Sequence, residues 1–217
     1  MNKTALELLH RGLKKLEVPH DTACIEKIER YVAELLLFNS RFDLVNADTD
    51  EQLVVRHILD SLAGYPLFAE TSAERIADIG SGAGFPGIPL AVFLPHVSFT
   101  LIERSDRRAG FLQNVAATLP LNNITVCSED ATRVQKTFDA VTARALTALD
   151  AAVFRMLFRL TAETGMLVLY KGNREKTAAE LKSLQTELAR AGATASITPV
   201  QAPFLESERC LAVIRRN

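Results

Sequence analysis

The sequence predicts a doubly wound α/β domain with a mostly parallel sheet, preceded by a helical extension. Two observations carry this prediction. Apolar residues in the first third of the chain recur at steps of three or four, as they do on one face of an amphipathic helix. Further on, short apolar runs alternate with longer amphipathic stretches, which is the pattern of βαβ units with right-handed crossovers. We therefore divide the 217 residues into an extension, residues 1–72, and a main domain, residues 73–217.

The extension is predicted to contain three helices. Pro19 separates the first two, and a third is expected from about residue 50 to residue 68, before a turn at residues 70–74. The apolar positions that define the first two helices are Leu6, Leu9, Leu13 and Leu16, and then Ile25, Ile28, Val32, Leu35 and Leu36.

The main domain is predicted to contain seven strands. The expected strands are Arg75–Ile79, Ser98–Glu103, Ile124–Ser128, Ala140–Ala143, Gly165–Lys171, Ala195–Val200 and Cys210–Arg215. Helices are expected to begin at Pro86, Asp106 and Asp150, and another to cover residues 174–191. The last two strands have no helix between them, so they should pair antiparallel. This arrangement resembles the class I methyltransferases, whereas a dinucleotide dehydrogenase needs a second mononucleotide-binding half.

Composition limits the classes of function. Hydrophobic residues make up 48% and charged residues 24% of the chain, as in ordinary globular proteins. The cysteines Cys24, Cys127 and Cys210 lie far apart, and the four histidines are scattered, so we predict neither a metal site nor a disulfide. No apolar run approaches the roughly 20 residues of a membrane span. We expect a cytoplasmic protein. With a net charge of −1, a nucleic-acid partner would need a local basic patch.

A glycine-rich loop follows the first strand of the main domain. Gly80, Gly82 and Gly84 permit positive φ angles and let the backbone approach a ligand closely. Glu103 ends the second strand, where a carboxylate can accept hydrogen bonds from both hydroxyls of a ribose. Asp78, two residues before Gly80, is placed to attract the ammonium group of a methyl donor. These residues predict a site for a nucleoside cofactor, which we interpret as S-adenosylmethionine.

The glycine pattern leaves alternatives open. Gly82, Gly84 and Gly87 also satisfy the G-x-G-x-x-G pattern of nicotinamide and flavin proteins. Asp78 at the end of a strand has an alternative role as a cap for the next helix. For Glu103 the alternative is an ion pair to a neighbouring arginine, Arg104 or Arg107.

Two further segments are expected at the same edge of the sheet. After the third strand, Asp130 and the backbone of Ala131 and Thr132 are our candidates for contact with adenine, the alternative being a polar turn that caps a helix. Arg144 ends the fourth strand beside the predicted cofactor crevice.

Five segments of the chain resemble, in order and spacing, the bacterial family of 16S ribosomal RNA guanine-N7 methyltransferases, also called the glucose-inhibited division protein B family. They are residues 56–61 (RHILDS), 78–89 (DIGSGAGFPGIP), 107–112 (RRAGFL), 142–145 (TARA) and 170–172 (YKG). The resemblance covers nearly the whole chain. It implies methyl transfer from S-adenosylmethionine to N7 of a guanosine in the 530 loop, G527 in the reference rRNA numbering.

The resemblance also assigns cofactor contacts. By it, Gly80, Phe85, the pair Ala131 and Thr132, and Arg144 fall on positions that touch the cofactor in the family. The chain departs from the family at Thr132, where the family often has a carboxylate. That departure puts a side-chain contact there in doubt, but leaves the backbone contact.

Guanine N7 carries a free lone pair and loses no proton when it is methylated, so positioning should dominate catalysis. We therefore assign no residue as acid or base. The candidates for holding guanine or RNA are Arg144, Lys171, Arg56 and His57. Each is equally consistent with an ordinary surface or ion-paired side chain, His57 with helix packing, and Asp60 with a pair to Arg56. A further basic cluster is formed by Arg104, Arg107 and Arg108.

The expected partner is 16S rRNA, within the small ribosomal subunit or an assembly intermediate, and the expected state is a monomer. Two other functions stay open on the sequence alone. One is a methyltransferase that acts on a small molecule, and the other is a nicotinamide-binding protein.

Overall fold

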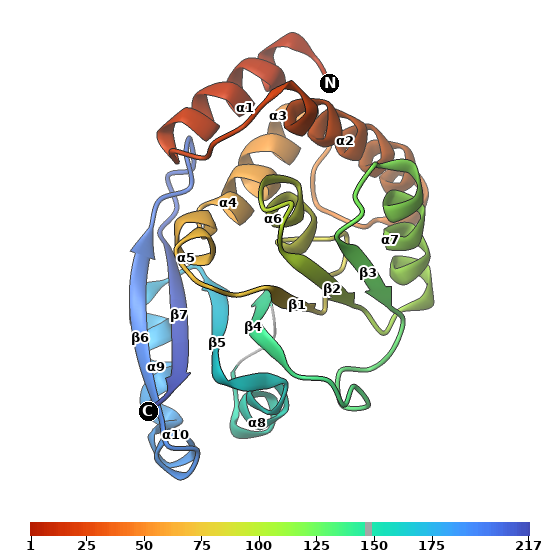
Figure 1. Cartoon of the computed structure of the whole chain (residues 1–217). Helices are drawn as coiled ribbons and strands as arrows, with labels where there is room; N and C mark the ends of the chain where they lie inside the picture. Colours follow the sequence, from red (N-terminus) through yellow and green to blue (C-terminus); the bar gives the residue numbers. More distant parts are fainter. Residues whose placement is uncertain (146–148) are drawn as a thin grey trace.

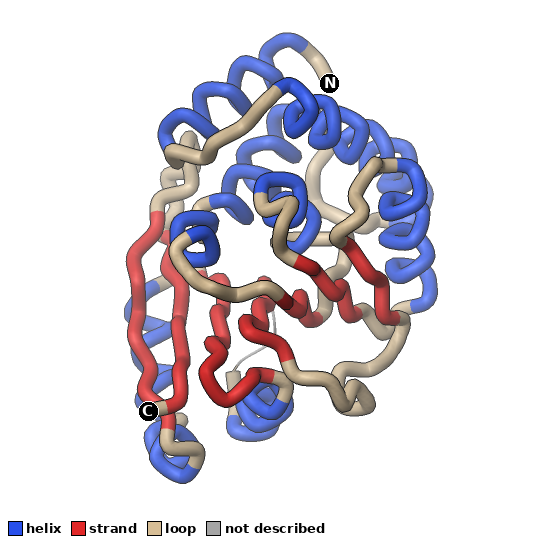
Figure 2. Tube along the Cα trace, viewed as in Figure 1, coloured by secondary structure: helices blue, strands red, loops and turns tan. Residues whose placement is uncertain are grey.

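The computed structural model describes residues 1–145 and 149–217 and shows one sheet with helices on both of its faces (Figures 1 and 2). The sheet has seven strands in the order β3-β2-β1-β4-β5-β7-β6. The strands are β1 Arg75–Ile79, β2 Ser98–Ile102, β3 Ile124–Cys127, β4 Phe138–Arg144, β5 Thr161–Lys171, β6 Ala193–Val200 and β7 Arg209–Arg216. The first five are parallel, and β7 pairs antiparallel with both β5 and β6. The predicted strands and the antiparallel hairpin are confirmed.

The sheet separates two apolar cores because successive side chains of a strand point to opposite faces. On one face, Phe99 of β2 and Val168 of β5 pack against helices from the first half of the chain. On the other, Ala77 of β1 and Leu167 of β5 pack against the helices that follow β4. The helices of the main domain are α6 Gly87–Phe93 and α7 Asp106–Thr118 on the first face, and α8 Ala151–Arg159, α9 Arg174–Ser183 and α10 Gln185–Arg190 on the second.

The extension begins with two capped helices, α1 Lys3–Lys15 and α2 Thr22–Phe42. The side chains of Asn2 and Asp21 accept hydrogen bonds from the backbone N–H groups of Ala5 and Cys24, which satisfies donors that a helix start leaves free. Both helices match the predicted apolar periodicity. Their buried leucines and isoleucines belong to the same core as Phe99 and Val168, so the extension packs directly on the main domain.

The third predicted helix, residues 50–68, is wrong as a single element. The chain instead forms α3 Asp50–Leu53, the π-helix η1 Val54–Leu59, α4 Asp60–Leu62 and α5 Tyr65–Ala69. The break before α5 lies at Gly64, where the ring of Tyr170 occupies the place of a side chain. The single helix predicted for residues 174–191 is likewise divided, at Leu184.

None of the helices in the described part of the chain combines the length and the apolar character needed to cross a bilayer.

Candidate active site at the carboxyl edge of the sheet

The glycine loop between β1 and α6 is an open turn. Gly80, Gly82 and Gly84 have φ angles of 66°, 59° and 101°, which side chains rarely adopt, so the sequence expectation for this loop is confirmed in its backbone. A Cβ placed on Gly82 would meet no atom closer than 3.8 Å, whereas one on Gly84 would collide with Ile88. Gly82 therefore faces open space and Gly84 serves close packing against α6.

Glu103 lies directly beside this loop. Its side chain is 5% exposed, and its two oxygens accept hydrogen bonds from the backbone N–H groups of Gly82 and Ser105, at 2.9 Å each. No ion pair joins Glu103 to Arg104 or Arg107 within the described residues; Arg104 is instead 3.9 Å from Asp130. The carboxylate is thus fixed at the mouth of the loop.

Asp78 is buried beneath the loop. Its Oδ2 accepts a hydrogen bond from the N–H of Gly87 at 3.0 Å, so it caps α6, as one reading of the sequence proposed. Its Oδ1 is buried and has no hydrogen-bond partner within the described residues. Burial raises the pKa of this carboxyl to about 7. A nearby cation would offset that desolvation.

The segment after β3 is held in a fixed turn. Asp130 accepts hydrogen bonds from the N–H and the hydroxyl of Thr132, and these bonds lower its pKa. Arg159 of α8 donates to the carbonyls of Ala131, Thr132 and Val134. The turn is therefore held by hydrogen bonds from both of its own ends and from α8.

A cavity of about 370 Å³ lies next to the ends of β4 and β5. It collects the four side chains that we predicted from the sequence to hold guanine or RNA. The residues around it are Arg56, His57, Asp60, Arg144, Ala145, Tyr170, Lys171, Gly172 and Arg209. These residues come from η1, α4, β4, β5, β7 and the turns after β4 and β5.

Arg144 is held by several groups at the wall of this cavity. Its Nη1 donates to Oδ2 of Asp60 and its Nη2 lies 3.1 Å from Nδ1 of His57. The guanidinium carbon is 4.8 Å from the ring centre of Phe85, which belongs to the glycine loop. The His57 ring stacks on the same Phe85 ring, with 5.0 Å between centroids. Phe85 thus joins the loop to the cavity.

His57 is neutral in this setting. Burial, and secondly the charge of Arg144, lower its pKa to about 4. With Nδ1 accepting from Arg144, the proton of the neutral ring belongs on Nε2, which is buried without a hydrogen-bond partner in the described structure.

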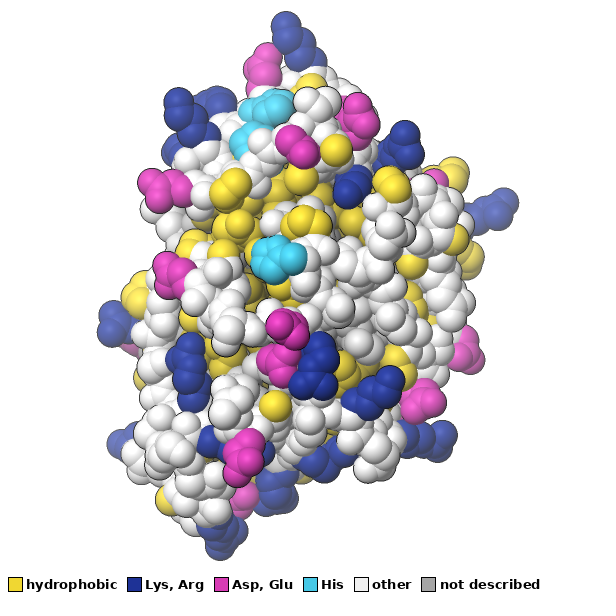
Figure 3. All heavy atoms as spheres, viewed as in Figure 1, with side chains coloured by type: hydrophobic (Ala, Val, Ile, Leu, Met, Phe, Trp, Pro, Cys, Tyr) yellow, Lys and Arg dark blue, Asp and Glu magenta, His cyan; other side chains and the backbone are white. Residues whose placement is uncertain are grey.

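The other cationic candidates differ in their surroundings. Lys171 is paired with Glu180 of α9 at 2.7 Å, while Arg56 is exposed. The suggested pair between Asp60 and Arg56 is wrong, because Asp60 pairs with Arg144 and Arg209. The face seen in Figure 3 mixes Lys and Arg with Asp and Glu.

Sequence reasoning missed two residues of this site. Tyr31 of α2 donates a 2.6 Å hydrogen bond to the carbonyl of Ala83 in the glycine loop. Arg209, the first residue of β7, donates to Asp60 at 2.6 Å. Both residues lie far in sequence from the groups they contact, so only the tertiary fold brings them to the site.

Two solved structures with the same architecture are methyltransferases. Magnesium protoporphyrin IX methyltransferase from Synechocystis PCC 6803, solved with bound SAM, aligns with a TM-score of 0.59 and 17% identity, over 85% of this chain and 97% of that one. The ribosomal protein L11 methylase from Lactobacillus delbrueckii subsp. bulgaricus aligns with a TM-score of 0.54 and 17% identity, over 73% and 77%. The fold is therefore that of the class I methyltransferases.

Sequence comparison identifies the family. Residues 24–206 match the family model described as "rRNA small subunit methyltransferase G". The ribosomal RNA small subunit methyltransferase G of Treponema pallidum, strain Nichols, is 38% identical over 192 residues, which are 86% of this chain and 83% of the relative. That of Treponema denticola is 35% identical and covers 96% and 94%. The chain belongs to the rRNA small subunit methyltransferase G family.

Proposed function

We propose that this enzyme transfers a methyl group from S-adenosylmethionine to N7 of a guanosine in the 530 loop of 16S rRNA. Beyond membership of the family, one observation carries the proposal. Phe85 of the glycine loop contacts His57 and Arg144 of the cationic cavity, so a donor bound at the loop and an acceptor in the cavity would be adjacent.

The residues at the loop fit the cofactor. The open turn at Gly82 leaves room for a ligand, and Glu103 stands beside it to bind the ribose. The unpartnered oxygen of Asp78 provides a negative charge for the ammonium group. Gly80, Gly84, Phe85 and Arg144 would complete the contacts with the methionine part, and Asp130, Ala131 and Thr132 those with adenine. When bound, the cofactor supplies a methyl group on a sulfonium.

The cavity fits an acceptor that needs orientation and no base. His57 is neutral and engaged with Arg144, and Asp60 is engaged with two arginines, so neither group is free to take a proton. This matches guanine N7, whose lone pair is already available. Arg144, Lys171, Arg56 and His57 would hold the base and its strand in line with the donor.

The partner in this proposal is 16S rRNA within the small subunit or an assembly intermediate, and the enzyme acts as a cytoplasmic monomer. A molecule with a net charge of −1 has no strong general attraction for RNA. Docking on a partly assembled subunit would add protein contacts to the local basic cavity.

Mass mapping of 16S rRNA tests the proposal. A strain that lacks this protein should lose one 7-methylguanosine, in the 530 loop, and the purified enzyme with S-adenosylmethionine should restore it on small subunits from that strain. Unchanged rRNA in the strain without the protein would contradict the assignment.

A further inference from the structure

The cationic cavity contains more positive than negative charge. Asp60 is the only carboxylate among the described residues that line it, and both of its oxygens are occupied, one by Arg144 and one by Arg209. Lys171 is balanced by Glu180. Arg56 makes no ion pair within the part of the chain that the structure describes. The carboxylate of Asp60 therefore pairs with two guanidinium groups, and the guanidinium of Arg56 lies at the same cavity.

This imbalance lies in a partly buried place. The side chains of Arg144 and Arg209 are 15% and 26% exposed, and that of Asp60 is 9% exposed. Water screens such charges less than it screens charges on an open surface, so an unbalanced guanidinium here is costly until an anion approaches. Glu208 is the carboxylate that precedes Arg209 in the sequence. It accepts hydrogen bonds from the side chain of Asn173 and the backbone N–H of Arg174, at the start of α9.

One nitrogen of the Arg209 guanidinium has no hydrogen-bond partner among the described residues. Its Nε donates to Asp60, and its Nη1 donates to the hydroxyl of Ser207 and to the carbonyl of Glu208. Its Nη2 donates to no group among the described residues. The arginine is thus fixed at two of its nitrogens while the third remains free, and a guanidinium fixed in this way is suited to an oxygen of a phosphate.

We propose that the cavity binds a phosphate group of the RNA strand next to the target guanosine, and that Arg209 is the residue that contacts it. The inference rests on the proposed function, since it names the part of the RNA that the acceptor cavity receives. Asp60 then has a positioning role: it orients Arg144 toward Phe85 of the glycine loop, and Arg209 toward the phosphate.

Binding of two simple probes tests this assignment. The protein saturated with S-adenosylhomocysteine is titrated by NMR with guanosine 5′-monophosphate and with guanosine, at low salt. We expect the nucleotide to bind at least about tenfold more tightly, the size of one charge-assisted hydrogen bond. Inorganic phosphate is the third arm. If it displaces the nucleotide at equal concentration, the cavity selects a free anion and not an RNA strand, which overturns the assignment to RNA.

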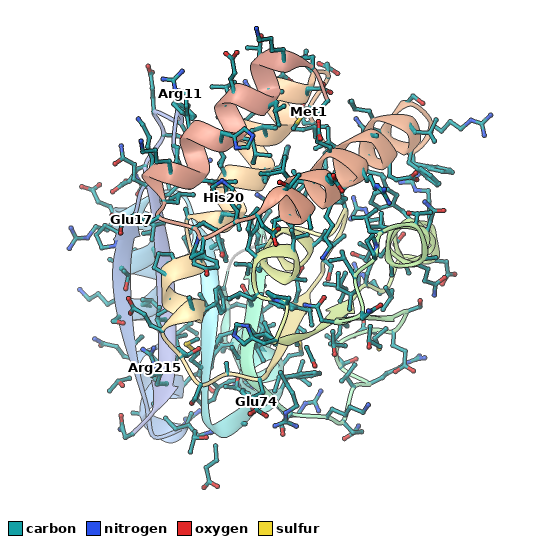
Figure 4. The ribbon with its side chains drawn as sticks, turned by 45° about the horizontal axis from the view of Figure 1, so that its top comes forward. Met1, Arg11, Glu17, His20, Glu74 and Arg215 are labelled. Carbon is teal, nitrogen blue, oxygen red and sulfur yellow. The ribbon has the colours of Figure 1, made fainter. Side chains whose placement is uncertain are left out.

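Three variants locate the contact. Arg209→Gln should remove the preference for the nucleotide, and Arg209→Lys, which keeps the charge but not the fixed guanidinium, should retain only part of it. The matched control is Arg215→Gln, which removes the same charge from the other end of the same strand; Arg215 and Glu74, both labelled in Figure 4, line the hollow there. Thermal unfolding of each variant shows whether it is folded.

The outcomes separate this inference from the proposed function. Equal affinity of the wild-type protein for both probes, or an unchanged preference in folded Arg209→Gln, overturns the phosphate site even if the enzyme methylates small subunits. A preference that depends on Arg209, in a protein that does not methylate small subunits, supports the phosphate site and contradicts the proposed function.

Discussion

The sheet has a hollow at the amino ends of its parallel strands, the amino edge, and another at their carboxyl ends, the carboxyl edge. The residues that line the two hollows differ in chemistry. At the amino edge, a hollow of about 690 Å³ is lined by loop residues and by the pair Arg75 and Asp139, with Arg75 57% exposed. At the carboxyl edge the cavity is about 370 Å³, and its ion pairs are partly buried. Exposed pairs contribute little, whereas buried and unbalanced charges are costly and are kept where a ligand uses them. The smaller hollow is therefore the better candidate site.

The sharpest test of this comparison is to remove one arginine from each edge. Arg144→Ala should lower kcat/KM for methylation of small subunits by about 10², because it removes a fixed hydrogen-bond donor beside the glycine loop. Arg75→Ala should leave activity nearly unchanged. Methyl transfer from radiolabelled S-adenosylmethionine measures both, and an equal loss in the two variants would contradict the assignment of the carboxyl edge.

A smaller effect, on cofactor binding, is expected when the carboxylate of Glu103 beside the glycine loop is replaced. Glu103→Gln should weaken binding of S-adenosylhomocysteine about tenfold, because a neutral amide holds both ribose and loop less well. Glu74→Gln, at the amino edge, is the control and should bind as the wild type does. Calorimetry measures the affinities. Wild-type affinity in folded Glu103→Gln would show that the ribose lies elsewhere.

The pH dependence of cofactor binding tests Asp78. Its pKa is raised to about 7, so much of this carboxyl is protonated below that pH, and a bound ammonium group favours the ionised form. Affinity for S-adenosylhomocysteine should therefore rise about fivefold from pH 5.5 to pH 7.5, a range in which the ligand's amino group stays largely protonated. Folded Asp78→Asn should bind with little dependence on pH. A flat wild-type profile would refute an electrostatic role.

The smallest effect concerns the link between the extension and the loop. Tyr31→Phe removes only the hydrogen bond to the carbonyl of Ala83 and should weaken binding of S-adenosylhomocysteine about threefold. Tyr65→Phe is the control, since the Tyr65 hydroxyl makes no hydrogen bond within the described residues. Equal affinities for wild type and Tyr31→Phe would mean that the extension supports the main domain without adjusting the loop.

The sequence predicted what depends on local pattern. Alternation and periodicity located the strands, and the glycines marked the turn because positive φ angles leave few other residues. The strand ends also placed Arg144 and Lys171 at one cavity, since parallel strands end at the same edge. Contacts between distant segments were not predictable in this way. The Asp60 pair with Arg209 spans 149 residues, and the division of residues 50–68 depends on packing between Gly64 and Tyr170.

The most direct measurement is a crystal structure of the protein with S-adenosylhomocysteine. We predict that the ribose hydroxyls lie within hydrogen-bonding distance of Glu103, that the amino acid part lies over the turn at Gly82, and that the sulfur faces the cavity beside Arg144. A ligand bound at the amino edge, or a ribose held away from Glu103, would contradict the assignment of this site.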